Sequence, residues 1–331
     1  MCIPRIPGGA IALVFCLFGI NAAVAQTVRN DAVSSYPERP VRLVVPVAPG
    51  GSSDGVARVV AQKLTEQWKQ QVVVDNRAGA AAIIGTNIVA KADPDGYTLV
   101  LVSLRHSVNP SLLKMPFDSV KDFAPITMTA AVGNVLVVNP KSPIMSVKEL
   151  IALAKEKPGQ LNFASSGIGG APHLTGEFFA LKTSIKLTHI AYKGGGPAVA
   201  DVVGGNVTMS FASMTSALLF IRSSRLRPLA VSSKTRSSQL PEVPTMAEAG
   251  VPDVFVLDWQ GILAPKGTPK ALVDKLSVTI RGILRDSEVG KRLTAMGLEV
   301  IASTPDEFLK AIESDVKRWA EVVKSANIKA N

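Results

Sequence analysis

A short segment near the start of the chain has the residue types and spacing of a hydrolase nucleophile. Gly51-Ser52-Ser53-Asp54-Gly55 matches G-x-S-x-G, which places a nucleophilic serine on a sharp turn between a strand and a helix. Three features oppose this interpretation. The segment follows the first predicted strand, whereas the nucleophile usually comes later in such sheets; Pro46 and Pro49 lengthen the turn; and no aspartate–histidine pair stands out downstream. A serine hydrolase is therefore the alternative function, and we expect no catalytic residue.

The same stretch, Pro49-Gly50-Gly51-Ser52-Ser53-Asp54, also suits the binding of an anion. Its two glycines allow positive φ and a close approach of the backbone to a ligand. Ser52, Ser53 or Asp54 can cap the helix that follows, and the first amides of that helix carry free N–H groups and the positive end of its dipole. A carboxylate could bind there without an arginine.

Three further segments combine small residues with a helix start: Gly79-Ala80-Ala81-Ala82-Ile83-Ile84-Gly85, Ser165-Ser166-Gly167-Ile168-Gly169-Gly170 and Tyr192-Lys193-Gly194-Gly195-Gly196-Pro197. All of them follow predicted strands. Because ligands of open parallel sheets bind at the carboxyl ends of the strands, the four loops together predict one ligand site. A simpler explanation stays open, since α/β proteins need glycine at many strand–helix turns.

The remaining chemistry-bearing residues form no recognisable motif. A phosphate loop of the G-x-x-x-x-G-K type is absent, and Pro172 stands where a dinucleotide fingerprint begun by Gly167 would need its third glycine. His106, His173 and His189 are isolated in the sequence and lack metal-ligand spacing, and no pair of carboxylates stands out for acid–base catalysis. We expect no cofactor, no metal and no enzymatic activity.

Short apolar runs alternate with helical patterns along most of the chain. The first series has strands at 41–47, 72–74 and 97–102, with helices at 56–68 and 83–92. The second has strands at 135–138, 161–164, 186–191, 207–211 and 226–231, with helices at 150–155, 173–181, 198–203 and 216–223. Strands separated by such helices favour parallel sheets covered on both faces, so each series predicts a three-layer α/β/α unit.

Helix-start signals support this division and add two helices at the C-terminal end. Ser146 with Glu149, and Thr304 with Glu307, form capping boxes, while Thr268-Pro269 supplies a threonine N-cap and a proline at the first helical position. The last two helices have apolar residues at helical spacing, and we expect them to pack on the first unit. A chain that crosses twice between two lobes has a two-strand hinge able to close around a ligand.

The N-terminus has the pattern of a cleavable export signal. Arg5 supplies a positive charge, residues 10–20 form an apolar run, and Ala23-Val24-Ala25 fits a cleavage site. The run is shorter than the roughly 20 apolar residues that span a bilayer. We expect residues 1–25 to be a signal peptide and the mature protein, starting at Gln26, to be periplasmic.

Composition narrows the function classes further. The two cysteines, Cys2 and Cys16, both lie in the predicted signal, so the mature chain has neither a disulfide nor a thiol nucleophile. The formal net charge is +10, but the basic residues are scattered and there are only three Trp and three Tyr. A basic–aromatic surface of the kind that binds nucleic acid is therefore not expected.

A series of motifs runs in order through the whole mature chain. They are Tyr36-Pro37-Glu38-Arg39-Pro40, Pro49 to Asp54, Asn76-Arg77-Ala78-Gly79, Asp93-Pro94-Asp95-Gly96-Tyr97, His173-Leu174-Thr175-Gly176-Glu177, Tyr192 to Ala198, Leu240-Pro241-Glu242-Val243-Pro244-Thr245, Trp259-Gln260-Gly261 and Ala264 to Pro269. Together they resemble one family, the substrate-binding receptors of tripartite tricarboxylate transporters, known as Bug or TctC-like proteins.

The resemblance implies an α/β, two-lobed periplasmic-binding-protein (Venus-flytrap) fold, made of two three-layer α/β/α lobes with a two-strand hinge. Residues 36–134 plus 258–331 would form lobe 1, and residues 135–257 lobe 2. It also implies a monomeric receptor that binds a mono-, di- or tricarboxylate and passes it to the membrane components of such a transporter, or to a sensor. In this family one ligand carboxylate is typically held by backbone groups and bridging waters.

Carried over to this sequence, the resemblance assigns ligand binding to both lobes. The first lobe contributes Pro49, Gly50, Gly51, Ser52, Ser53, Asp54, Gly79, Ala80 and Ser103. The second lobe contributes Ser165, Ser166, Gly169, Tyr192, Lys193 and Gly194. Three variable positions would contact the distal end of the ligand: His106, Ser213 and Asp258.

Three departures from the family pattern leave the ligand's identity open. Residues 81–84 are bulkier than the usual glycine-rich stretch, Leu104-Arg105 replaces small residues ahead of His106, and Ser213-Met214-Thr215 stands where an acidic or amide residue is common. An arginine at position 105 would favour a second carboxylate if it faces the cleft. It could equally be a surface arginine.

Overall fold

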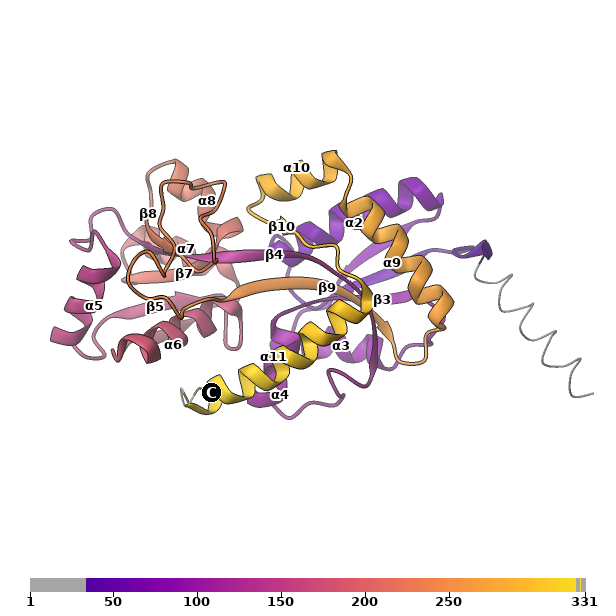
Figure 1. Ribbon diagram of the computed structural model, residues 1–331, viewed down its shortest axis with the longest axis horizontal. Helices are drawn as coiled ribbons and strands as arrows, with labels where there is room; N and C mark the ends of the chain where they lie inside the picture. The colour runs from indigo at the N-terminus through magenta and orange to yellow at the C-terminus, as the bar shows by residue number, and fades with distance from the viewer. Residues whose placement is uncertain (1–33, 326–327, 329–331) are drawn as a thin grey trace, which may run out of the picture. The chain divides into compact units, whose positions relative to one another are not determined.

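The computed structural model describes residues 34–325 and residue 328, so the predicted signal at 1–25 lies outside the described residues. The chain divides into two compact units, residues 1–38 and residues 39–331, and the fold below belongs to the second unit. Its described part contains ten strands in one sheet, in the order β2-β1-β3-β9-β4-β7-β5-β6, with β8 and β10 also paired to β4 (Figure 1). None of the helices in the described residues combines the length and hydropathy that a membrane span requires.

The first lobe is built around one half of this sheet. Its strands are β1 (Val41–Val45), β2 (Val72–Asn76), β3 (Thr98–Ser103) and β9 (Leu257–Pro265), and its first helices are α2 (Ser52–Trp68), η1 (Ala80–Ala82), α3 (Ile83–Ala90) and α4 (Arg105–Leu112). β1 pairs in parallel with β2 and with β3, and β9 runs antiparallel to β3. Helices cover both faces of these strands, which explains why β1 is a nearly uninterrupted apolar run.

The second lobe repeats the alternation around the other half of the sheet. Its strands are β5 (Asn162–Ser165), β6 (Thr188–Ala191), β7 (Met209–Ser213) and β8 (Arg227–Val231), and its helices are α5 (Val147–Glu156), α6 (Ala171–Thr183), α7 (Gly195–Gly204) and α8 (Met214–Arg222). β5 pairs in parallel with β6 and β7. Phe163, Phe179 and Phe211 anchor a buried cluster of this lobe, separate from the cluster that contains Trp259 and Trp319.

One long strand joins the two halves. β4 (Phe123–Val138) pairs with β9 as far as Gly133, and from Asn134 it pairs with β7 and β8 instead. The chain returns to the first lobe at β9, so two strands cross between the lobes. This change of pairing partner in β4, the Gly133–Asn134 switch, lies next to the predicted lobe boundary at 134/135. The boundary itself remains a prediction.

The prediction of parallel sheets is confirmed for β1 with β2 and β3 and for β5 with β6 and β7, but it is wrong for the strands that pair with β4 and β9. β4 is antiparallel to β7, β8 and β9, and β9 is antiparallel to β3, because both crossing strands traverse the sheet from the opposite end. The sequence pattern marked only residues 135–138 of β4 as a strand. Its first part contains Thr127 and Thr129, which are fully buried and satisfied by hydrogen bonds to the Ser303 and Gln260 carbonyls, so the apolar signal is weak there.

The two predicted C-terminal helices pack on the first lobe, and a third helix, which was not predicted, lies between them in the chain. They are α9 (Lys270–Leu284), α10 (Ser287–Ala295) and α11 (Pro305–Ser325), with the short strand β10 (Glu299–Val300) between the last two. α9 packs against α2 and β4, and α11 against α4 and β4. Figure 1 shows α10 and β10 on one side of β4 and β9, and α4 and α11 on the other.

The predicted helix starts are largely confirmed. Thr304 and Glu307 form the expected reciprocal capping box, with N···O distances of 2.8 and 3.3 Å. Ser146 caps α5 through the Glu149 N–H. At α9 the N-cap is Pro269 rather than Thr268, because the Thr268 hydroxyl donates to the Pro265 carbonyl instead of capping the helix.

Candidate functional site

The loop after β1 leads into α2 without a side-chain cap. Gly51 is the N-cap residue in an extended conformation, and Gly50 has a φ of +90°. The prediction that Ser52, Ser53 or Asp54 caps this helix is therefore wrong. No other atom lies within 4 Å of a Cβ built on either glycine, so there is open space beside the start of α2.

Asp54 holds this loop in place. Its carboxylate accepts hydrogen bonds from the Gly50 N–H at 3.0 Å, from Arg58 Nε at 2.9 Å and from Asn76 Nδ2 at 3.0 Å. Burial alone would raise the pKa of Asp54, but these hydrogen bonds together hold it below its usual value. Both oxygens are occupied, so Asp54 shapes the loop with its side chain and is not placed to bind an anion itself.

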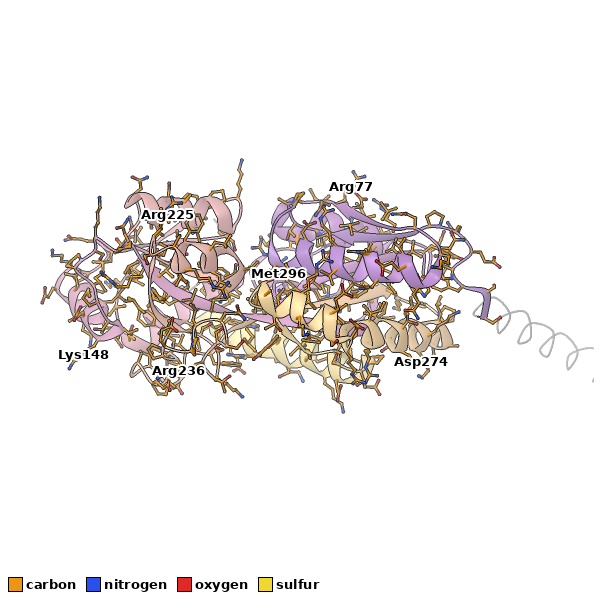
Figure 2. The ribbon with its side chains drawn as sticks, turned by 90° about the horizontal axis from the view of Figure 1, so that it is seen from above. Arg77, Lys148, Arg225, Arg236, Asp274 and Met296 are labelled. Atoms are coloured by element: carbon orange, nitrogen blue, oxygen red, sulfur yellow. The ribbon has the colours of Figure 1, made fainter. Side chains whose placement is uncertain are left out.

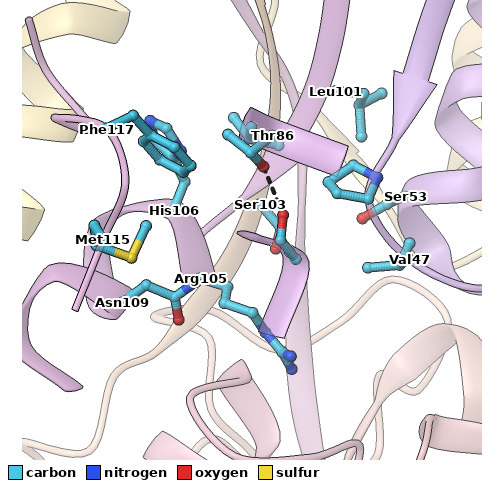
Figure 3. Close-up of a pocket in the computed structure, with 13 residues that line it drawn as sticks. Val47, Ser53, Thr86, Leu101, Ser103, Arg105, His106, Asn109, Met115 and Phe117 are labelled. Carbon is cyan, nitrogen blue, oxygen red and sulfur yellow. Dashed lines mark hydrogen bonds between the residues drawn. The ribbon is translucent and has the colours of Figure 1, made fainter. Parts of the chain in front are cut away.

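The turn after β2 has an unusual backbone. Gly79 has a φ of +135°, and the three alanines that follow, Ala80, Ala81 and Ala82, all have positive φ (44°, 53° and 75°). This left-handed region is costly for residues with a Cβ. Thr86 Oγ1 donates to the Ala82 carbonyl at 2.8 Å, the dashed line in Figure 3.

A pocket lies where these first-lobe loops meet the end of β3. It is lined by Pro46, Val47, Ser53, Ala82, Thr86, Leu101, Val102, Ser103, Arg105, His106, Asn109, Met115 and Phe117. Its volume of about 10 Å³ has room for about one water molecule. Any organic acid therefore needs additional room at the mouth of this pocket, where second-lobe residues approach.

α4 meets the second-lobe loop at the mouth of the pocket. A Cβ built on Gly170 would lie 2.6 Å from Arg105 Nη2, and one built on Gly169 would lie 3.5 Å from Asn109 Oδ1. Leu174 of α6 belongs to the same buried cluster as Val108 of α4. The structure thus brings the glycine loop at 165–170 against the first lobe.

Arg105 faces this contact rather than bulk solvent. Its half-buried side chain extends away from His106 and Phe117 in Figure 3. Burial raises the pKa of Asp258 to about 6 despite the opposing effects of the Arg105 charge and the Leu104 N–H. Burial also lowers the pKa of Arg105, and Asp258 partly offsets this.

Ser165 and Tyr192 organise the second-lobe loops. Ser165 is fully buried; its Oγ accepts from the Gly167 N–H at 3.1 Å, and its carbonyl accepts from the Tyr192 N–H at 3.0 Å. The Tyr192 hydroxyl donates to Asp201, and this hydrogen bond is the main reason why the pKa of Tyr192 is raised to about 12. Tyr192 can therefore offer its backbone to the site, while its hydroxyl is already bound.

The other second-lobe candidates lie near the starts of α7 and α8. Gly194 is the N-cap of α7, with a φ of +144°, and Lys193 is exposed. Ser213 is the N-cap of α8, and its Oγ lies 2.7 Å from Ser216 Oγ. A Cβ built on Gly195 would lie 3.0 Å from the Ser216 hydroxyl, so these two helix starts face each other.

Comparison with known proteins identifies the family. A sequence model of the tripartite tricarboxylate transporter family receptor matches residues 56–328. The protein BugT of Bordetella pertussis is 40% identical over 319 residues, which cover 96% of this chain and 98% of BugT. The chain belongs to the tripartite tricarboxylate transporter receptor family.

Solved structures similar to this receptor share its fold. Rpa4515 of Rhodopseudomonas palustris, solved with adipate, has a TM-score of 0.84 and 33% identity, covering 89% of this chain and 99% of its own. The periplasmic binding protein BugD has a TM-score of 0.82 and 36% identity, and the match covers 89% of this chain and 100% of BugD. MatC of Rhodopseudomonas palustris, solved with malate, has a TM-score of 0.81 and 29% identity, and the match covers 87% of this chain and 100% of MatC. The two-lobed periplasmic-binding-protein fold is confirmed.

The histidines of this receptor are less isolated than the sequence indicated. The rings of His173 and His189 stack with centroids 4.0 Å apart, and Glu177 lies 3.6 Å from His173 Nε2. These three residues are close enough to be considered as metal ligands. However, His173 Nδ1 accepts from the Gly169 N–H, and His189 Nε2 lies 2.6 Å from Ser165 Oγ, so both rings already have hydrogen-bond partners. Burial lowers the pKa of His189 to about 3, so it is neutral at pH 7.

His106 is buried in the first-lobe core of the receptor. Its Nε2 lies 2.8 Å from the Ser119 carbonyl oxygen, and its ring stacks on Phe117 and contacts the edge of Phe123. Burial lowers its pKa to about 4. It still lines the pocket, so its assignment to the distal end of the ligand stays a prediction. Its ring position is fixed by packing.

The sequence analysis missed one polar residue of the first lobe that lies beside the second-lobe glycine loop. Asn109 donates from Nδ2 to the Ala81 carbonyl at 2.7 Å, and its Oδ1 has no hydrogen-bond partner among the described residues. Asn109 belongs to α4, which was not predicted because Pro110 lies inside it. The spacing of four residues from Arg105 was the available signal.

Proposed function

We propose that this protein is a periplasmic receptor that binds a small organic carboxylate between its two lobes. The observation that carries this proposal is the set of glycine-started helices α2, α6 and α7, which follow β1, β5 and β6 and have no side-chain caps. Their first N–H groups and dipoles attract an anion. The proposed ligand-binding residues are those assigned to the loops of both lobes in the sequence, with Arg105 and Asn109 added. Asp54, whose carboxylate already accepts three hydrogen bonds, would contribute only its backbone N–H.

The solved relatives support the ligand class. Rpa4515 was solved with adipate and MatC with malate, and both are carboxylates. A carboxylate at the start of α2 would accept charge-assisted hydrogen bonds, which are about twice as strong as neutral ones. Exclusion of water between the lobes would strengthen them further, because the local dielectric constant falls.

The two strands that cross between the lobes could act as a hinge that links ligand binding to delivery. We propose that rotation about the two connections between lobes, at the Gly133–Asn134 switch in β4 and just before β9, closes the cleft around the ligand. The closed receptor would then present the ligand to the membrane components of a tripartite tricarboxylate transporter. Export through a signal at 1–25 and a lobe division at 134/135 and 257/258 belong to the same proposal.

Hydrolysis at Ser53 is not favoured. Ser53 lies in the first turn of α2, and none of the hydrogen bonds recorded for the described residues joins it to a histidine. A Ser–His pair within hydrogen-bond reach is the signature of such a nucleophile. We propose that the ligand is bound and released unchanged.

A screen of mono-, di- and tricarboxylates by thermal unfolding tests the proposed function. Ligands that bind the folded state raise the free energy of unfolding by RT ln(1 + [L]/Kd), so a true ligand raises the melting temperature by an amount that grows with concentration. Failure of every carboxylate to shift unfolding would overturn the proposal. Consumption of the ligand during incubation would support the hydrolase instead.

Substitution of Gly51 by valine tests the loop itself. The Gly51 backbone has a φ of −87° and open space around its Cβ position, so valine should fold normally while obstructing the amides of α2. We expect a loss of ligand affinity of roughly 10-fold or more, as for a lost charge-assisted hydrogen bond. Gly282→Val, on the exposed side of α9, is the matched control and should leave affinity unchanged. Unchanged affinity in the Gly51 variant would show that the ligand binds elsewhere.

A further inference from the structure

Arg105 occupies an unusual position for a charged residue. It begins α4 in the first lobe, yet its Nη2 atom lies so close to the second-lobe loop that a Cβ on Gly170 would be 2.6 Å away. A Cβ on Gly167 would be 3.9 Å from the same atom. The guanidinium thus occupies the space that a side chain at position 170 would need.

The guanidinium of Arg105 lies beside another positive group and has no carboxylate within ion-pair distance among the described residues. Gly170 is the N-cap of α6, a helix of 13 residues without a side-chain cap, so the positive end of its dipole lies beside the cationic side chain. The carboxylate that influences Arg105 is Asp258, but no ion pair within 4.0 Å joins them among the described residues. A cation and a helix N-terminus that repel each other are both stabilised by an anion placed between them.

Asn109, at the same edge of the pocket, has a buried oxygen atom without a hydrogen-bond donor in the part of the chain that the structure describes. The Ala81 carbonyl can only accept a hydrogen bond, so the Asn109 amide must direct Nδ2 toward it and Oδ1 toward Gly169. That buried Oδ1, in a residue only 3% exposed, has no partner within residues 34–325. A buried acceptor without a donor costs about 1–3 kcal/mol.

The two residues are suited to act together. Arg105 and Asn109 are four residues apart and therefore share one face of α4. A guanidinium N–H is the kind of donor that Asn109 Oδ1 lacks. With one N–H turned toward Asn109, the planar fork of Arg105 still offers paired donors to a carboxylate.

We propose that Arg105 binds a second carboxylate of the ligand, so that the receptor selects dicarboxylates over monocarboxylates. This inference rests on the proposed function, in which the first carboxylate binds the amides of α2. The second carboxylate lies between Arg105 and the start of α6, on the second-lobe side of the pocket. Asp258 opposes its charge, while remaining too far from Arg105 to replace it.

Pairs of acids that differ only in the second carboxylate test this directly. Isothermal titration calorimetry would compare butanoate with succinate, pentanoate with glutarate, and hexanoate with adipate. We expect the dicarboxylate of at least one pair to bind roughly 10- to 100-fold more tightly, the value of a charged, paired hydrogen-bond interaction. Arg105→Met, which keeps the apolar stem, should abolish this difference and leave monocarboxylate affinity nearly unchanged.

Two further variants keep the test informative if Arg105→Met is poorly folded. Asp258→Asn removes the opposing charge and should tighten dicarboxylate binding, whereas Arg105→Lys should retain part of the preference. Arg225→Met, an exposed arginine of the second lobe labelled in Figure 2, is the charge-matched control and should change nothing.

Each outcome bears on the inference. Equal affinity for both members of every pair, or an unchanged preference in Arg105→Met, overturns it while leaving the receptor function standing. If no carboxylate of any kind binds, the proposed function itself is wrong.

Discussion

Helices that begin at the site differ from helices that begin elsewhere in how their first N–H groups are satisfied. α2, α6 and α7 start from Gly51, Gly170 and Gly194, and no side chain caps them. By contrast, Ser146 caps α5, Asp286 caps α10 through two N–H groups, and a capping box starts α11. The uncapped starts follow parallel strands at their carboxyl ends, where both lobes bring their loops.

This difference shows that the site is maintained at a cost in stability. An N-cap side chain contributes about 1 kcal/mol to a helix, although glycine recovers part of that value. The positive φ values of Ala80 to Ala82 and the raised pKa of Asp258 are further costs within the same region. Absence of a cap alone does not mark a site, since α9 starts at Pro269, which has no polar side chain, and lies elsewhere.

Unlike these features, Asp54 stabilises the site, and its substitution has the largest expected effect on the free energy of unfolding. Its folded pKa is lowered, so its contribution is fully present above the unfolded value of about 3.8 and is lost as the pH falls through the lower folded pKa. We expect Asp54→Asn to lower the free energy of unfolding by about 2 kcal/mol at pH 7, because a buried carboxylate that accepts three hydrogen bonds loses its charge. Urea denaturation at pH 7 and below pH 3 measures this, and the difference should shrink at the lower pH.

Asp253→Asn is the matched control for that experiment. Asp253 pairs with Lys182 at 3.0 Å, but its side chain is 69% exposed, so we expect a change below about 0.5 kcal/mol. If the two variants lose the same stability, Asp54 is not the anchor of the α2 loop, and the loop must be ordered by other contacts.

Asp286 tests the other half of the comparison. Its Oδ1 accepts from the Glu288 and Val289 N–H groups at 2.9 and 3.2 Å, and Asp286 is not among the residues that line the pocket at the end of β3. We expect Asp286→Ala to lower the free energy of unfolding by about 1 kcal/mol and to leave carboxylate affinity unchanged. Denaturation and calorimetry on the same preparation would check both. A clear loss of affinity would mean that capping outside the site is also coupled to binding.

The sequence predicted the framework better than it predicted the site's contacts. Alternation of apolar runs and helical patterns identified nearly all elements of β1 to β8, because each is a local signal. α4 was missed since Pro110 lies inside it, and β9 since Gln260 and Gly261 interrupt its apolar pattern. The glycine loops were recognisable from composition. Contacts such as Arg105 with Gly170 depend on how the lobes are placed, which no local pattern encodes.

The turn at residues 80–82 tests how much stability its left-handed backbone costs, and the expected effect is the smallest of those given. Ala81 has φ 53° and ψ 42°, a left-handed conformation that costs roughly 1–2 kcal/mol for a residue with a Cβ. Glycine removes that cost but loses about 0.5–1 kcal/mol through greater freedom in the unfolded chain. We therefore expect Ala81→Gly to raise the free energy of unfolding by about 0.5 kcal/mol, measured by urea denaturation.

The same substitution in a regular helix should have the opposite sign. Ala320 is exposed within α11, where glycine costs about 1 kcal/mol relative to alanine. Opposite signs at the two positions would show that backbone conformation, and not the loss of a methyl group, decides the outcome. Equal destabilisation would mean that the 80–82 turn carries no strain. The costs of the site would then be confined to its uncapped helix starts and its buried charges.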